Sequence, residues 1–251
     1  MNLCSLSSLA SNLRKGRLPW PALAVLFALI LGLGIASPSA NGTSRKEARK
    51  ATRSVETLGP PVKAYGSKDA PITMEVFTDY ECPSCRNLYE NTLRPMINDY
   101  VASGKVYLIH HDFPLPMHKY GFEAARWANA AARVGEFGAV EAALYDNQDS
   151  WGADGNIAKY VSAAMSAADF KRVQKQMDGC MVVPASPAAA QNSHGCALDA
   201  YIEEDRALGM RIPVTATPTY IISYKGQHLP AQTGFLSWSI LKQFFDSLLS
   251  Q

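Results

Sequence analysis

The 251-residue chain carries 24 Lys and Arg against 22 Asp and Glu, so its formal net charge at neutral pH is only +2. Nucleic-acid-binding proteins usually show a strong basic bias, and this near balance argues against a nucleic-acid partner. The apolar content of 47% is normal for a globular protein, and the length suits one ordinary domain with a segment added in front of it.

Residues 1–40 form the added segment. They combine a basic flank, an apolar run over residues 22–35 and small residues around Ala36 and Ala40, which is the pattern of a secretory signal peptide. Counted from Trp20, the apolar stretch approaches the lower limit for spanning a bilayer, so an uncleaved N-terminal membrane anchor is the alternative. In both cases the basic flank stays inside and the rest of the chain is exported.

Residues 41–60 are polar and charged and end in Gly59 and Pro60. This composition indicates a flexible linker ahead of a domain over residues 61–251. We expect the domain to open with a short edge strand over residues 62–65, followed by a turn over residues 66–69.

A Cys-Pro-Ser-Cys motif occupies residues 82–85, directly after a β-branched and aromatic run over residues 71–77 that predicts a strand. Apolar residues then recur at three- and four-residue steps up to position 101, which predicts a helix with Pro83 in its first turn. Cys82 therefore lies at the helix cap, among unpaired backbone N–H groups and at the positive end of the dipole, where a thiolate is favoured. We expect Cys85, one turn deeper, to be shielded and the Cys82 sulfur to be exposed, as thiol-disulfide exchange requires.

Two other interpretations of the motif compete with this one. A zinc site needs four ligands, and although His194 and Cys196 could complete one, no second Cys-x-x-Cys or His-x-x-x-His is present. A purely structural Cys82–Cys85 disulfide would close a loop too small to remove much entropy from the unfolded chain. Redox exchange is the favoured interpretation, and neither a metal nor another cofactor is expected.

The chain beyond the motif is mostly helical in pattern. A second strand is predicted over residues 106–111, and Pro95 is expected to kink the helix that precedes it. From about residue 118 to 210 the chain is rich in alanine, and no strand pattern interrupts it. Helical spacing there predicts helices over residues 119–133, 137–147, 157–164, 167–178 and 197–208.

Cys180 and Cys196 bracket a loop rich in proline and alanine. With Cys4 inside the predicted signal, four cysteines remain, an even number that suits an oxidising compartment. We predict a structural disulfide between Cys180 and Cys196, which would contribute about 3 kcal/mol through the entropy of the unfolded chain. A second redox pair and two free buried thiols are the alternatives.

A proline stands at the entrance to the last predicted strand, where residues 214–222 read Val-Thr-Ala-Thr-Pro-Thr-Tyr-Ile-Ile. A turn over residues 224–226 and a final helix over residues 237–249 are predicted to follow. By base rates alone, the Thr217–Pro218 bond would be trans.

Three stretches, residues 77–85, 111–115 and 215–222, resemble in sequence and order the DsbA-like thiol oxidoreductases of the thioredoxin superfamily. The resemblance covers roughly residues 60–250. It implies an α/β thioredoxin fold, with a central mixed sheet flanked by helices and an inserted α-helical subdomain over about residues 118–210. It also implies a cis bond before Pro218, which would face the Cys-x-x-Cys motif and present the backbone of Thr217 to an extended substrate segment.

The same resemblance implies an exported, monomeric protein disulfide oxidoreductase, located in the bacterial periplasm or on the outer face of the inner membrane. Cys82 would form mixed disulfides with secreted substrate proteins that contain cysteines, and Cys85 would resolve them in the reverse direction. A membrane quinone-linked reoxidase of the DsbB type would be the partner. A disulfide reductase or isomerase is one alternative, and a non-catalytic thioredoxin-fold binding or chaperone module is another.

Two positions depart from the family pattern. DsbA has histidine where this chain has Ser84, next to Pro83, and this dipeptide strongly affects the stability of the reduced thiolate. Many thioredoxin-like proteins have a buried acid where this chain has Val76. The neighbouring Glu75 should point to the other face of the sheet, because side chains alternate along a strand.

Charged residues beside the motif are expected to act on Cys82 in opposite directions. Asp79 and Glu81 would disfavour its thiolate, and Arg86 would favour it. Histidines occur at positions 110, 111 and 118, but no motif assigns them a catalytic role, and polar contacts are the expectation for them.

Overall fold

The computed structural model describes residues 61–178, 180 and 196–251. The predicted signal or anchor over residues 1–40, the predicted linker over residues 41–60 and His194 lie outside these ranges. Within them, no helix is both long enough and apolar enough to span a membrane.

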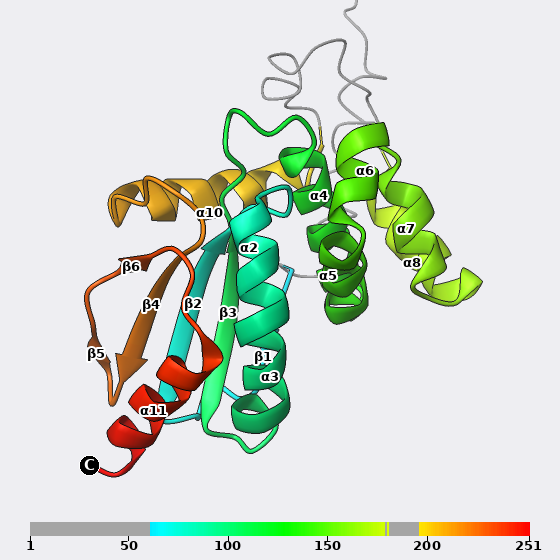
Figure 1. The fold of residues 1–251 in the computed structure, drawn as a ribbon. Helices are drawn as coiled ribbons and strands as arrows, with labels where there is room; N and C mark the ends of the chain where they lie inside the picture. Colours follow the sequence, from blue (N-terminus) through cyan, green and yellow to red (C-terminus); the bar gives the residue numbers. More distant parts are fainter. Residues whose placement is uncertain (1–60, 179, 181–195) are drawn as a thin grey trace, which may run out of the picture. The chain divides into compact units, whose positions relative to one another are not determined.

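A six-stranded mixed sheet forms the centre of the described domain (Figure 1). Its strands are β1 (Ala64–Tyr65), β2 (Ile72–Thr78), β3 (Val106–Asp112), β4 (Thr219–Tyr224), β5 (Gln227–His228) and β6 (Gln232–Thr233). The central β2 runs parallel to β3 and antiparallel to β4. β1 pairs with β3 at one edge, and β5 and β6 pair with β4 at the other. The predicted edge strand and the predicted strand–helix–strand unit are both confirmed.

The helix after β2 also agrees with the prediction. α2 (Pro83–Leu88) begins with Pro83 and continues through a π-helical stretch (Tyr89–Leu93), α3 (Arg94–Met96) and a second π-helical stretch (Ile97–Val101). Pro95 lies in α3 and has no N–H to donate, and the hydrogen bonds on both sides of it span one residue more than in an α-helix. The disturbance predicted at Pro95 takes the form of these wider turns.

The helical insertion contains one element that the sequence did not reveal. Its helices are α4 (Gly121–Ala132), α5 (Phe137–Asp146), α6 (Gln148–Asp154), α7 (Ile157–Ala163), α8 (Ala167–Gln176) and α10 (Asp199–Arg211). α6 was missed because Trp151 is its only large apolar residue, too little to show helical spacing. The final helix, α11 (Trp238–Leu249), lies where it was predicted, and the described part of residues 118–210 contains no strand.

Side-chain alternation along β2 explains how both faces of the sheet are covered. Met74 and Val76 belong to the main core, together with Leu88 of α2 and Phe245 of α11. Phe77 points to the opposite face, into a smaller apolar cluster that Leu208 of α10 packs against. Figure 1 accordingly shows α2, α3 and α11 on one side of the sheet and α10 on the other. The predicted fold class, a thioredoxin fold with a helical insertion, is confirmed.

Candidate active site

The two cysteines of the motif lie at the start of α2. Cys82 is the N-cap residue, with extended backbone angles (φ −78°, ψ 120°), and its carbonyl oxygen accepts hydrogen bonds from the N–H groups of Cys85 at 3.0 Å and Arg86 at 3.2 Å. Both cysteines are free thiols in this structure. The predicted helix-cap geometry is therefore present, and Pro83 and Ser84 form the first turn of α2 between the two cysteines.

The expectation of an exposed Cys82 sulfur was wrong in degree. Cys82 is only 7% exposed, against 0% for Cys85. Two segments that are distant in sequence contact Cys82. The Thr217 carbonyl oxygen lies 3.5 Å from the Cys82 Sγ atom, and Gln148 of α6 donates from Nε2 to the Cys82 carbonyl oxygen at 3.0 Å. A substrate sulfur must therefore approach Cys82 along a restricted path.

The two thiols differ sharply in acidity. A hydrogen bond from the Cys85 thiol has the largest effect on Cys82, and with bonds from Thr217 and the N–H groups at the start of α2 it outweighs burial and lowers the Cys82 pKa to about 5. Burial, and then the hydrogen bond to Cys82 and its charge, raise the pKa of Cys85 well above the ordinary thiol value. At neutral pH, Cys82 is thus a thiolate and Cys85 a thiol.

The peptide bond between Thr217 and Pro218 is cis and lies at the entrance to β4. The Pro218 carbonyl oxygen accepts from the Gly234 N–H at 2.8 Å, next to β6. The Thr217 carbonyl can accept a hydrogen bond from the Cys82 thiol only while Cys82 keeps its proton. The Thr217 side chain, by contrast, lowers the Cys82 pKa. The structure thus brings residues 217 and 218 together with the Cys-x-x-Cys motif, 135 residues away in sequence.

The position of the family's buried acid is apolar here. Val76 is fully buried in the main core. Glu75 points to the opposite face, as strand alternation predicted, and its Oε2 atom lies 2.8 Å from Nε2 of His111. His111 Nδ1 in turn lies 2.8 Å from Oδ1 of Asp205 in α10. These three side chains form a charged cluster on the far side of the sheet from the two cysteines.

Asp79 joins the motif to the loop between β3 and α4. One carboxylate oxygen accepts from the N–H of Glu81 at 2.9 Å, and the other accepts from the N–H of Leu115 at 2.7 Å and lies 2.6 Å from His118 Nδ1. Sequence reasoning missed the role of His118, since only the stretch over residues 111–115 marked this loop. Arg86, which was expected to favour the thiolate, instead pairs with Asp149 at 2.8 Å.

Cys180 and Cys196 form a disulfide with a Cα–Cα distance of 4.6 Å. Because Cys196 is bonded in this way, it cannot complete a zinc site with the Cys-x-x-Cys motif, and His194 lies outside the described residues. The groups of His, Cys, Asp and Glu in the described ranges include none placed to hold a metal ion.

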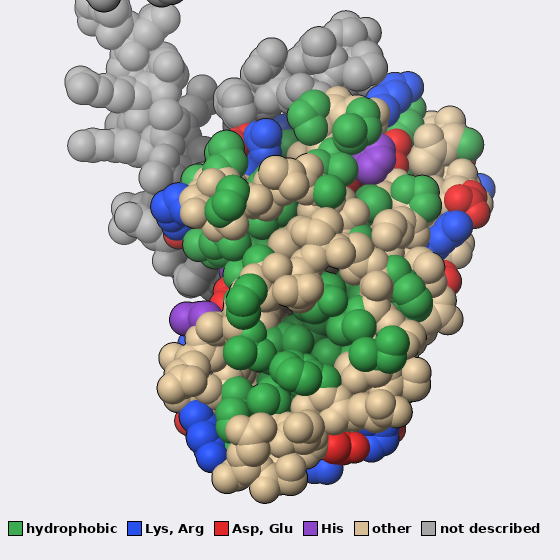
Figure 2. Space-filling view, turned by 60° about the vertical axis from the view of Figure 1, so that its left-hand side comes forward, with side chains coloured by type: hydrophobic (Ala, Val, Ile, Leu, Met, Phe, Trp, Pro, Cys, Tyr) green, Lys and Arg blue, Asp and Glu red, His purple; other side chains and the backbone are tan. Residues whose placement is uncertain are grey.

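An apolar groove of about 400 Å³ lies beside the strand that follows Pro218. Figure 2 shows hydrophobic side chains gathered on this face of the molecule. The groove is lined by Tyr220 and Ile222 of β4, Ile240 and Phe244 of α11, and Leu229 and Leu236 from the chain between these two elements.

Comparison with known proteins is consistent with this arrangement. A family model described as "Thioredoxin" matches residues 59–232. The chain is also 25% identical over 185 residues to the Na(+)/H(+) antiporter NhaA 3 of Salinispora tropica; the match covers 73% of this chain and 25% of the antiporter. The chain thus spans about a quarter of the length of that curated relative.

Solved structures of low sequence identity share the fold. A variant of Wolbachia pipientis α-DsbA1 is 18% identical, with a TM-score of 0.58 over 76% of this chain and 92% of that chain. Bacillus subtilis BdbD in its oxidised form is 18% identical, with a TM-score of 0.54 over 77% and 97%. Pseudomonas aeruginosa DsbA2 is 22% identical, with a TM-score of 0.52 over 74% and 93%. The chain therefore has the fold of these DsbA-type proteins.

Proposed function

The chain belongs to the thioredoxin family, and from that membership we propose that it is an exported protein thiol-disulfide oxidoreductase that oxidises substrate thiols through a Cys82–Cys85 disulfide. The observation that carries this proposal is the contrast between the two thiols. Cys82 has a pKa of about 5 at the helix cap, and Cys85 is fully buried with a raised pKa. A stable leaving thiolate beside a shielded partner is what disulfide donation requires.

The exchange proceeds in two steps. A substrate thiolate attacks the Cys82 sulfur, the Cys82–Cys85 bond breaks, and Cys85 leaves with the electron pair and takes up a proton. The substrate's second thiolate then attacks the substrate sulfur that is bonded to Cys82, and Cys82 leaves as a thiolate. Two electrons have passed from the substrate dithiol to the protein, and an external oxidant must remove them before the next cycle.

The substrate class and the partner belong to the same proposal. The apolar lining of the groove beside β4 suits an unfolded protein segment with exposed hydrophobic side chains better than a small polar thiol. The backbone of Thr217, presented next to Cys82, can pair with such a segment. The oxidant would be a membrane quinone-linked reoxidase of the DsbB type, and the site of action would be extracytoplasmic.

Oxidative refolding tests this function. A reduced, unfolded protein with several cysteines is incubated with catalytic amounts of the oxidised enzyme and with glutathione disulfide as the terminal oxidant. We expect faster recovery of the folded substrate, abolished by Cys82→Ser. Insulin reduction is measured in parallel: fast insulin reduction without any acceleration of refolding would assign the protein to the reductases, and inactivity in both assays would leave only a binding or chaperone role.

A further inference from the structure

His118 and Cys82 both form hydrogen bonds with Asp79. The Asp79 carboxylate is buried, and one of its oxygens lies 2.6 Å from His118 Nδ1. The Asp79 backbone carbonyl accepts from the Cys82 N–H at 3.0 Å, and its N–H donates to the Cys85 Sγ atom at 3.5 Å. Because one residue holds all three groups, the histidine is fixed relative to the reacting sulfurs.

Close packing keeps Asp79 in place. A Cβ atom added at Gly121, at the start of α4, would come within 2.5 Å of the Asp79 Oδ1 atom, so the glycine is needed for this approach. Glu81 binds the same loop, since its carboxylate accepts from the N–H of Tyr120. The loop between β3 and α4 is therefore clamped to the segment that leads into Cys82.

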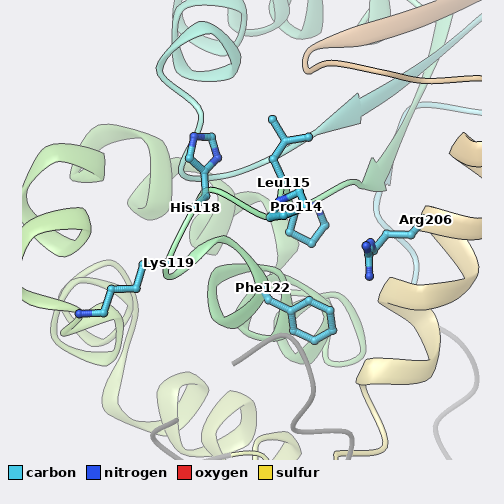
Figure 3. Close-up of a pocket in the computed structure, with 7 residues that line it drawn as sticks. Pro114, Leu115, His118, Lys119, Phe122 and Arg206 are labelled. Atoms are coloured by element: carbon cyan, nitrogen blue, oxygen red, sulfur yellow. The ribbon is translucent and has the colours of Figure 1, made fainter. Parts of the chain in front are cut away.

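Figure 3 shows His118 among the residues that line a small pocket. The ring points towards the segment between β2 and α2, whereas Lys119 and Phe122 point away from it. These residues and Arg206 of α10 line one small pocket. The His118 side chain is 19% exposed, so part of the ring remains accessible to solvent.

The charges around His118 favour its protonated form. The hydrogen bond to Asp79 raises the pKa of His118 most, and the charges of Asp79, Glu81 and Cys82 raise it further against the effect of burial. Lys119 and Arg206 are the basic groups that share its pocket. Without an imidazolium at this place, the Asp79 carboxylate would lose its ion-pair partner, and its negative charge would disfavour the Cys82 thiolate.

We propose that His118 is a positioning residue of the exchange reaction, whose imidazolium, held by Asp79, stabilises the Cys82 thiolate as it leaves the mixed disulfide. The inference rests on the proposed exchange at Cys82. In the step concerned, the substrate's second thiolate attacks the substrate sulfur and Cys82 departs with the electron pair. His118 keeps its proton throughout and acts only through its charge. It supplies a positive charge that Ser84, between the two cysteines, cannot supply.

Linkage gives a test that needs no substitution. If the imidazolium stabilises the thiolate, the thiolate must stabilise the imidazolium by the same free energy. The His118 ring is titrated by NMR in the reduced and in the disulfide form of the wild-type protein. We expect its pKa to be higher in the reduced form by about one unit, a tenfold effect. His228, exposed on β5 and bonded to Ser223, is the internal control and should titrate alike in both forms. Equal His118 values in the two forms would overturn the inference.

A variant supplies the reciprocal measurement. In reduced His118→Gln, which can still donate a hydrogen bond to Asp79, the Cys82 pKa measured by thiolate absorbance should rise by about one unit, while His228→Gln should match the wild type. An unchanged Cys82 pKa in folded His118→Gln would contradict the inference, and if that variant does not fold, the wild-type titration decides alone. Failure of the proposed function can be distinguished from failure of this inference. In that case the wild-type protein would lack exchange activity, although the pKa values of His118 and Cys82 would still depend on each other.

Discussion

The Thr217 carbonyl oxygen lies 3.5 Å from the Cys82 sulfur, so the residue before the cis-proline contacts the reacting atom itself. Thr217 has a second group at this place, because its hydroxyl is buried and has no hydrogen-bond partner within standard geometry among the described residues. The hydroxyl nevertheless contributes to lowering the pKa of Cys82. We infer that it turns towards the sulfur when Cys82 ionises, since a thiolate accepts hydrogen bonds and a carbonyl cannot donate one.

Thr217→Val tests this inference, because valine has nearly the same shape without the hydroxyl. The Cys82 pKa should rise by roughly one to two units, the effect expected for losing one hydrogen bond to a charged group. Thiolate absorbance against pH gives the value. Thr217→Ser keeps the hydroxyl and should stay close to the wild type. If valine and serine behave alike, the hydroxyl has no part in stabilising the thiolate.

The Cys180–Cys196 disulfide should stabilise the domain without taking part in exchange. The two cysteines are 16 residues apart in sequence, and the chain-entropy estimate for such a loop is about 3 kcal/mol. Replacing both with alanine should lower Tm by roughly 6–12 °C in a domain of this size. Refolding activity at a temperature where the variant is folded should remain near that of the wild type. If the variant still shows a cooperative thermal transition but has lost its refolding activity, the pair would instead be a redox relay.

His111 should make stability depend on pH. Burial lowers its pKa, but hydrogen bonds and charges from Asp205 and Glu75 prevail and raise it to about 9. A raised folded-state pKa gives stability that is fully present below the unfolded value of about 6.5 and is lost as pH rises through the folded value. Between about pH 6.5 and 9, the free energy of unfolding should therefore fall, by about 3 kcal/mol at most.

Urea unfolding of the oxidised protein across this pH range measures the loss, because the active-site thiols do not titrate in the disulfide form. His111→Gln should be less stable near pH 6 and should lose most of the slope. A smaller residual slope is expected from His118, whose pKa Asp79 also raises. A variant with the full wild-type slope would show that His111 is not the titrating group.

The elements that could be predicted from the sequence are those whose signal is local. β2, the start of α2 and the proline before β4 each follow from a few consecutive residues. The contact between Asp79 and His118 could not be predicted in this way, because it joins two loops across 39 residues and each residue alone looks like an ordinary polar surface group. The burial of Cys82 was misjudged for a related reason: its neighbour Gln148, which bonds the Cys82 carbonyl oxygen, comes from α6, a helix with almost no apolar periodicity.

The last prediction concerns the direction of electron flow, which the reduction potential of the Cys82–Cys85 couple decides. A stabilised thiolate favours the reduced form and makes the disulfide an oxidant. Thioredoxin, with a nucleophilic cysteine of pKa about 7, has a potential near −270 mV, and DsbA, with a pKa of about 3.5, lies near −120 mV. A Cys82 pKa of about 5 falls between them, and linear interpolation gives a potential of about −185 mV.

Equilibration with glutathione buffers, read by alkylation and mass shift of the two thiols, measures this potential. The reduced protein should also resist denaturant better than the oxidised protein, because the same thiolate interactions stabilise its folded state. In His118→Gln and Thr217→Val the potential should move towards that of thioredoxin, while in His228→Gln it should not move. A wild-type potential near −270 mV, together with an oxidised form that is the more stable to denaturant, would reject the oxidase assignment and favour the reductase, since a disulfide of that stability would not be donated to substrate proteins.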